Sequence, residues 1–218
     1  MINRPTKIAI VTGNAKGLGK RISERLVDLG YHVPDTIRSA DYDLSEAAAA
    51  ARLVEDTITK YGRLDLLVNN LGNYVAKSID DISVTEWQDL IGSNLNASFY
   101  LSKFALPHLR KTKGKIINIG FASLENYSPE PNIIAYHTAK MGLLSLTQGL
   151  AKAEASQGVL VNMVSPGSME NTVKHNAISK IPLGRLATLD EVTDAVLFLI
   201  SSDYITGQNL EVAGGWGL

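Results

Sequence analysis

Short, nearly continuous apolar runs alternate with longer helical patterns along this chain, and this alternation constrains its fold more than any other feature. Runs without alternating polar positions are typical of parallel strands that helices cover on both faces. The runs expected to form strands are 7–11, 64–68, 115–119, 159–164 and 210–212. The helical patterns lie around 18–29, 45–61, 85–109, 135–157 and 190–199. The sequence therefore predicts a single α/β domain, residues 1–218, with a doubly wound parallel sheet in a three-layer arrangement.

Two local patterns refine this expectation. Ser83-x-x-Glu86 and Thr188-x-x-Glu191 both have the form of a capping box, which marks the start of a helix. Between residues 31 and 44 the chain is too short for a second pair of strand and crossover helix, because parallel neighbours need a dozen or more connecting residues. We therefore expect the sheet to lack one strand and one helix after its second strand. Pro34 fits an edge strand, and a helix at 38–44 would contradict this expectation.

The composition excludes several function classes. The chain has no cysteine, so disulfides, thiolate catalysis and thiolate metal sites are excluded, and its four histidines lack ligand-like spacing. A net charge of −1 with dispersed basic residues does not indicate nucleic-acid binding. No apolar run approaches the ~20 residues that span a bilayer, and the N-terminal residues lack a signal-peptide pattern. We expect a cytoplasmic protein without a metal.

A glycine-rich segment, Thr12-Gly-Asn-Ala-Lys-Gly-Leu-Gly19, lies between the first expected strand and the first expected helix. Glycines allow a tight turn and a close approach of the backbone to a ligand, and the following helix offers free N–H groups to a pyrophosphate. The spacing differs from the general dinucleotide fingerprint Gly-x-Gly-x-x-Gly, and a purely structural turn is the alternative. The position between strand and helix favours nucleotide binding.

Tyr136 and Lys140 are four residues apart, which places both side chains on one face of a helix. A nearby ammonium favours the phenolate and lowers the pKa of a tyrosine, so the pair is a candidate proton donor. An exposed helical pair without function is the alternative interpretation.

Together with Asn69-Asn-Leu-Gly72, Asn94 and Pro166-Gly167, these motifs occur in the order found in short-chain dehydrogenases/reductases, which the chain resembles over essentially its whole length. The resemblance implies a Rossmann-type sheet, an NAD(P)-dependent oxidoreductase and a small-molecule substrate. It also implies a homotetramer or homodimer built on the long helices that follow the strands at 64–68 and 115–119.

The resemblance implies a set of cofactor-binding residues: Thr12, Gly13, Asn14, Lys16, Gly17, Leu18, Gly19, Arg38, Ser39, Asp43, Leu44, Asn70, Gly72, Tyr136, Lys140, Pro166, Gly167 and Met169. Asp43 would contact the adenine amino group. Lys16 and Arg38 resemble the basic residues of members that use NADP(H), and a guanidinium suits a phosphate geometrically. Asp35 or Asp41 could instead accept a ribose hydroxyl, so NADP(H) is favoured over NAD(H) but not established.

The resemblance further implies that Tyr136 is the general acid, that Lys140 lowers its pKa and binds the nicotinamide ribose, and that Asn94 holds a water molecule. The family's serine falls just past the 115–119 strand. The strand end places Phe121 in that position, whereas counting back from Tyr136 reaches Ser123. Both assignments stay open, and a phenyl group could not hydrogen-bond a substrate carbonyl.

Tyr74 follows the Asn69–Gly72 motif, where pteridine and dihydrofolate reductases of the family have an aromatic residue that stacks on the pterin. We therefore expect hydride transfer to a C=O or C=N bond, with a pterin-like substrate and with Tyr74 and Phe121 in contact with it. A 3-oxoacyl-thioester reductase and a non-catalytic dinucleotide-binding sensor or scaffold are the alternatives. A helix at about 170–180 and the segment 181–185 would form a substrate lid.

Overall fold

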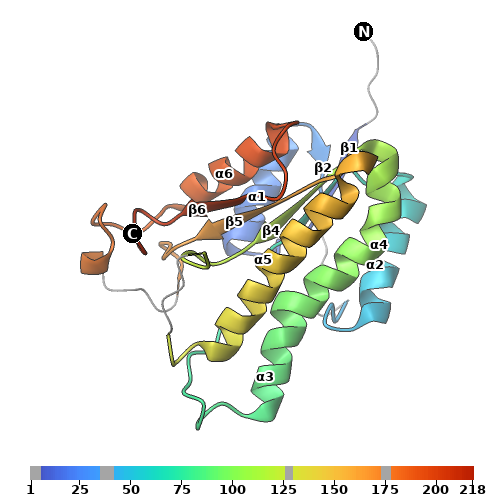
Figure 1. The fold of residues 1–218 in the computed structure, drawn as a ribbon. Helices are drawn as coiled ribbons and strands as arrows, with labels where there is room; N and C mark the ends of the chain where they lie inside the picture. Colours follow the sequence, from blue (N-terminus) through green and yellow to red (C-terminus); the bar gives the residue numbers. More distant parts are fainter. Residues whose placement is uncertain (1–5, 35–41, 126–129, 173–177) are drawn as a thin grey trace.

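The computed structural model describes residues 6–34, 42–125, 130–172 and 178–218, which form a parallel sheet between two layers of helices (Figure 1). The strands are β1 (Lys7–Val11), β2 (Tyr31–His32), β3 (Leu66–Asn69), β4 (Lys115–Ile119), β5 (Leu160–Pro166) and β6 (Asn209–Val212). The α-helices are α1 (Gly17–Asp28), α2 (Ala47–Tyr61), α3 (Val84–Ile91), α4 (Ala97–Thr112), α5 (Ile134–Glu154) and α6 (Leu189–Ser201). The strand order β2-β1-β3-β4-β5-β6, parallel throughout, confirms the predicted doubly wound architecture.

Residues of the central strands alternate between two hydrophobic cores. In β1, Ile8 and Ile10 pack in a core with residues of α2 and α4, whereas Ala9 and Val11 pack in a second core with residues of α1 and α6. Figure 1 shows these helix pairs on opposite faces of the sheet. Because both faces are buried, most positions of such a strand are apolar, which explains the nearly continuous runs in the sequence.

The edge of the sheet agrees with the expected loss of a strand. β2 has only two residues and pairs with β1 through Tyr31 and His32. No further strand pairs beyond β2 in the part of the chain that the structure describes. Pro34 lies just after this strand rather than in it. Residues 35–41, and with them Arg38 and Ser39, lie outside the described residues.

The expected helix at 85–109 is interrupted, which corrects the prediction. A π-helix at Gly92–Asn96 separates α3 from α4. A π-helical turn contains one more residue than an α-helical turn and often lies at a functional site. The spacing of apolar residues in the sequence does not distinguish the two kinds of turn, so a continuous helix was expected. The expected lid helix is not observed in its described parts either: residues 170–172 form a turn and Ile178–Lys180 a 3₁₀ helix, while 173–177 lie outside the described residues.

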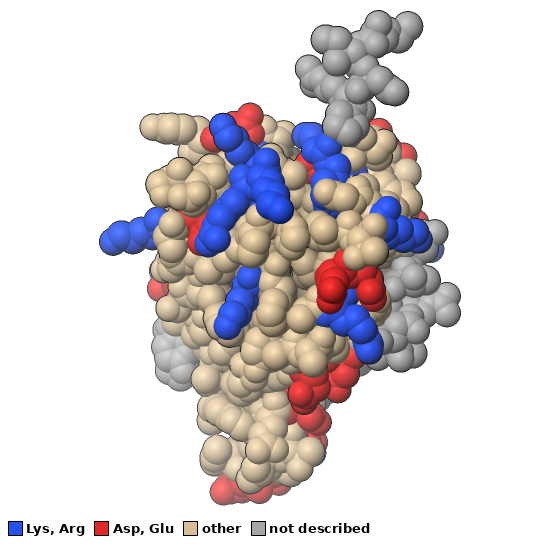
Figure 2. All heavy atoms as spheres, turned by 90° about the vertical axis from the view of Figure 1, so that its right-hand side faces the viewer, with Lys and Arg blue, Asp and Glu red and all other residues tan. Residues whose placement is uncertain are grey.

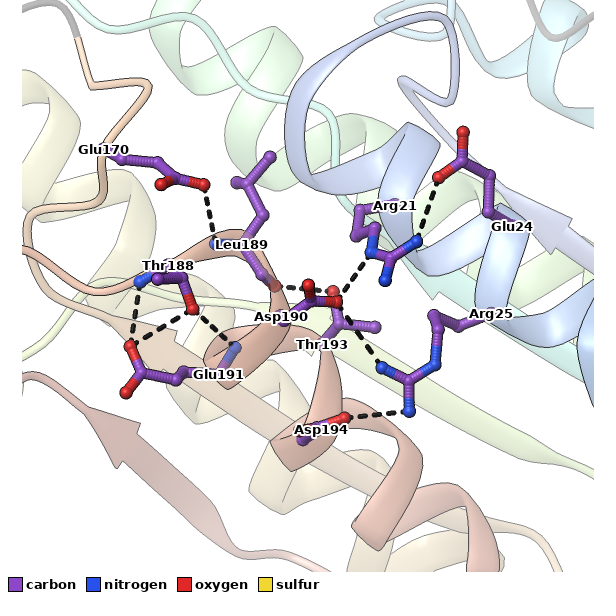
Figure 3. Close-up of polar contacts among 10 residues, drawn as sticks. All are labelled: Arg21, Glu24, Arg25, Glu170, Thr188, Leu189, Asp190, Glu191, Thr193 and Asp194. Atoms are coloured by element: carbon purple, nitrogen blue, oxygen red, sulfur yellow. Dashed lines mark hydrogen bonds and ion pairs between the residues drawn. The ribbon is translucent and has the colours of Figure 1, made fainter.

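Both predicted capping boxes are confirmed, at the starts of α3 and α6. Figure 3 shows the second one, where the Thr188 hydroxyl accepts from the N–H of Glu191 at 3.2 Å and the Glu191 carboxylate accepts from the N–H of Thr188 at 2.9 Å. Close to it, Arg21 of α1 contacts Asp190 of α6 at 2.6 Å. These contacts help to fix α6 beside α1.

The described residues contain neither a membrane-spanning helix nor a candidate metal cluster. None of their helices is long and apolar enough to cross a membrane. They also contain no group of three or more histidine, aspartate and glutamate side chains that could hold a metal ion.

Candidate active site

The candidate site lies at the carboxyl ends of the parallel strands, where ligands bind in open α/β sheets. β1 leads into the glycine turn at Thr12–Gly19, and β3 leads into Asn70 and Gly72. β4 and β5 lead into Phe121 and Gly167. Most of the predicted site residues are therefore brought to one end of the sheet, although they are far apart in the sequence.

Thr12 joins the turns after β1 and β3. Its hydroxyl accepts hydrogen bonds from the backbone N–H groups of Asn70 at 2.8 Å and Leu71 at 3.0 Å. The Asn70 side-chain amide donates to the Thr12 carbonyl at 3.0 Å. A side chain at Gly19 would collide with the Gly13 carbonyl, so the start of α1 can approach the turn only with glycine there.

The rest of the predicted cofactor set surrounds this turn. Asn14 donates to the Pro34 carbonyl at 3.2 Å, and Lys16 is exposed at the N-terminal end of α1. Asp43, at the approach to α2, accepts from the hydroxyl of Ser45 at 2.6 Å. Gly17 has a φ of +56°, and Leu18 and Leu44 are buried in the core.

The last members follow β5, which ends at Pro166. The Gly167 N–H donates to the Val212 carbonyl, and the Met169 N–H donates to the Thr172 hydroxyl.

Asn94 is fully buried at the centre of the π-helix. Its amide nitrogen donates to the carbonyls of Asn73 at 2.9 Å and Leu90 at 3.1 Å. Its Oδ1 has no hydrogen-bond partner among the described residues and lies against Gly72, where any side chain would collide with it. A buried amide oxygen without a partner indicates a position for a bound water or another donor.

Lys140 lies on the inner side of α5 and is almost fully buried. Its ammonium donates to the Ile119 carbonyl at the end of β4, at 2.8 Å, and lies 5.6 Å from the centre of the Tyr136 ring. Burial lowers the pKa of Lys140 to about 8. The spacing argument is thus confirmed in its geometry, because both side chains lie on one face of the helix.

The pKa of Tyr136 is shifted in the direction opposite to the expectation. Burial raises this pKa, and the charge of the neighbouring Tyr74 phenolate raises it further. The physical reason is the surroundings of the phenol: aromatic rings contact it, and the Lys140 ammonium donates its hydrogen bond to a backbone carbonyl. Loss of hydration therefore outweighs the attraction of the ammonium for a phenolate.

An aromatic cluster encloses Tyr136. Tyr74 and Phe121 both meet its ring edge to face, with centroid distances of 5.0 Å and 5.5 Å. Phe121 also contacts Trp216 at 5.6 Å and His137 at 6.3 Å. Trp216 and His137 were not among the residues predicted for the site. Their positions depend on how the C-terminal segment and α5 pack, and no local sequence signal indicates this.

The two assignments for the serine position now differ in geometry. Phe121 lies against Tyr136, whereas the Ser123 hydroxyl donates to the Trp216 carbonyl at 3.3 Å. The Ser123 N–H donates to the Glu211 carboxylate at 2.8 Å. Ser123 has a φ of +64°, a conformation that is uncommon for a residue with a side chain. Its hydroxyl is therefore directed to the C-terminal segment.

Comparisons with known proteins gave matches over nearly the whole chain. Residues 7–217 match a family model described as enoyl-(acyl carrier protein) reductase. The chain is 34% identical to the 3-oxoacyl-(acyl-carrier-protein) reductase FabG of Salmonella typhimurium, over 96% of both chains. It is 32% identical to the Escherichia coli protein of the same name, over 98% of both chains. Among solved structures, an aldohexose dehydrogenase of Thermoplasma acidophilum has a TM-score of 0.85 and 29% identity, and the match covers 96% of this chain and 93% of that one.

Proposed function

Because the chain belongs to the short-chain dehydrogenase/reductase family of oxidoreductases, we propose that it is an NADPH-dependent reductase of a C=O or C=N bond with Tyr136 as the proton donor. The observation that carries this proposal is the position of the Tyr136–Lys140 pair at the carboxyl end of β4, where Lys140 donates to the Ile119 carbonyl and lies 5.6 Å from the centre of the Tyr136 ring. The buried Asn94 lies against Gly72, at the carboxyl end of the neighbouring strand β3.

The described residues fit a dinucleotide. The N-terminal turn of α1 begins at Gly17 and leaves backbone N–H groups and a positive dipole end for a pyrophosphate. The free Oδ1 of Asn94 supplies a polar position deeper in the site. The nicotinamide would supply the hydride, and the protein would supply placement and the proton.

Burial raises the pKa of Tyr136, so the phenol is protonated at neutral pH but is a weaker acid than a free tyrosine. The proposal therefore requires that the negative charge forming on the substrate oxygen draws this proton. The phenolate that remains would be stabilised by the ammonium of Lys140, which lies 5.6 Å from the ring centre. Lys140 itself, with a pKa of about 8, can exchange a proton near neutral pH.

Lys16 supports NADP(H) over NAD(H). Its side chain is exposed in the glycine turn, where an ammonium can meet a phosphate without crossing the core. The other basic residue of the proposal, Arg38, lies outside the described residues. NAD(H) remains the alternative cofactor.

For the substrate, the proposal is a planar, pterin-like ring. Tyr74 and Phe121 support it, because both rings contact Tyr136 and the Tyr74 ring is half exposed. A 3-oxoacyl thioester is the second candidate and is supported by the similarity of the chain to 3-oxoacyl-(acyl-carrier-protein) reductases. A dinucleotide-binding sensor without turnover is the third.

The test is NADPH oxidation with dihydrobiopterin and, separately, with an acetoacetyl thioester. Replacing Tyr136 by Phe should lower kcat by about 1,000-fold, because general acid catalysis contributes on the order of 10² to 10⁴. Tyr204→Phe is the matched control, since Tyr204 is fully exposed.

Full activity of Tyr136→Phe would exclude the proposed mechanism. Tight NADPH binding without turnover of either compound would favour the sensor, and faster turnover with NADH would refute the cofactor preference.

We also propose that the chain forms a homodimer or homotetramer through α4 and α5. A hollow of about 530 Å³ lies between these helices on their outer side. Its lining residues are Leu95, Asn96, Phe99, Gly142, Ser145, Leu146, Gly149 and Leu150. Figure 2 shows the side of the molecule that carries α4, where uncharged atoms cover most of the middle and lower part. A second copy of the chain is the proposed occupant.

A further inference from the structure

Reduction of a carbonyl group places negative charge on its oxygen, and this charge is best stabilised by two fixed hydrogen-bond donors. On the proposed function, Tyr136 is one donor. The described site lacks the expected second one: the Phe121 ring has no hydrogen to donate, and the Ser123 hydroxyl donates to the Trp216 carbonyl. The structure therefore raises the question of which group takes the serine's role.

Tyr74 is a second phenol beside Tyr136. It reaches the site from the segment after β3, and its ring meets Tyr136 with a centroid distance of 5.0 Å and an interplanar angle of 79°. Tyr74 is 48% exposed, so a substrate can reach its phenol, whereas the Phe121 ring contacts both Tyr136 and Trp216.

The surroundings of Tyr74 favour the neutral form of its phenol. Burial and the carboxylate of Glu130 raise the pKa of Tyr74 itself. Tyr74 therefore stays protonated at neutral pH and is able to donate a hydrogen bond.

We propose that Tyr74 is a second catalytic residue, which donates a hydrogen bond to the substrate oxygen in place of the family's serine hydroxyl. The inference rests on the proposed function with a C=O bond as the group that is reduced. In the step, the carbonyl carbon accepts a hydride from the reduced dinucleotide, the C=O π bond breaks, and the oxygen takes the proton of Tyr136. Tyr74 keeps its own proton throughout. The dinucleotide is oxidised and the carbonyl is reduced, so atoms and electrons balance.

A purely stacking role for Tyr74 gives a different result, and Tyr74→Phe separates the two because it keeps the ring and removes the hydroxyl. With the acetoacetyl thioester as substrate, we expect this variant to lower kcat about 100-fold with little change in KM. Adding Phe121→Ser to Tyr74→Phe should restore at least part of kcat, since it returns a hydroxyl to the position beside Tyr136. Tyr204→Phe is again the control.

The outcomes separate this inference from the proposed function. If Tyr136→Phe is inactive while Tyr74→Phe has the full kcat of the parent protein, Tyr74 only stacks and the inference is wrong. If Tyr136→Phe is itself fully active, the proposed mechanism is wrong before Tyr74 is considered.

A second measurement does not depend on turnover. 4-Nitrophenol is a planar probe whose anion has a visible absorbance and resembles the charged oxygen of the reduced carbonyl. We expect the parent protein to bind the anion about tenfold more tightly than Tyr74→Phe does, and the double variant with Phe121→Ser to recover this affinity. Equal affinity of parent and Tyr74→Phe, or no binding to either, would overturn the inference.

Discussion

Lys140 destabilises the folded protein at neutral pH because its ammonium is buried. Burial lowers the pKa of Lys140 from the ordinary 10.5 to about 8. The unfolded chain therefore binds more protons than the folded one between about pH 8 and pH 10.5, and the free energy of unfolding rises with pH across this interval. Below about pH 8 the cost of the buried ammonium is fully present, on the order of 3 kcal/mol for such a shift.

Lys140→Met should accordingly stabilise the fold at pH 7 by about 2 kcal/mol, after loss of the hydrogen bond to the Ile119 carbonyl is subtracted. This advantage over the parent protein should shrink by about 2 kcal/mol on going to pH 10. Urea unfolding at both pH values measures it. Lys152→Met on the exposed side of α5 is the control and should show no such change. An advantage independent of pH would contradict the proposed cause.

At the scale of elements, the sequence was sufficient wherever local pattern and burial agree. β1 and β4 match their apolar runs, because both faces of these strands are buried and the pattern has clear ends. The π-helix at Gly92–Asn96 was not predictable, since Asn94 is held by the Asn73 carbonyl, a contact between separate segments. The contact between Phe121 and Trp216 also joins separate segments and was not predictable either. Sequence motifs identified the site residues, but their mutual contacts are known only from the fold.

The start of α6 offers a test of a local signal. Thr188 accepts from the N–H of Glu191, and this pair begins the helix that packs beside α1 (Figure 3). Replacing Thr188 by Ala should lower the free energy of unfolding by about 1 kcal/mol, because an N–H at the helix start loses its partner. Thr188→Ser keeps the hydroxyl and should lose much less. Thermal unfolding of the parent protein and the two variants measures these differences in stability. Equal stability of all three would show that the capping box contributes nothing measurable.

At the scale of the whole molecule, the proposed contact between copies depends on the outer face of α4 and α5. Phe99 of α4 is 43% exposed and lines the hollow beside Gly142 and Gly149 of α5. Small residues let two helices approach closely, and an exposed ring gives a partner apolar surface to cover. Figure 2 shows most of the lysine and arginine atoms in the upper half of this side, with some near its middle and largely uncharged atoms below.

Gly149→Arg tests this contact without disturbing the folded protomer. A side chain at Gly149 would meet no atom within 4 Å, and arginine favours a helix more than glycine does. We expect sedimentation velocity to show an oligomer for the parent protein and a monomer for Gly149→Arg, because a charged side chain would be buried between the copies. Ser201→Arg, on the exposed end of α6, adds the same charge elsewhere and should leave the oligomer intact. An unchanged oligomer in Gly149→Arg would place the contact on another face, and a monomeric parent protein would refute the association itself.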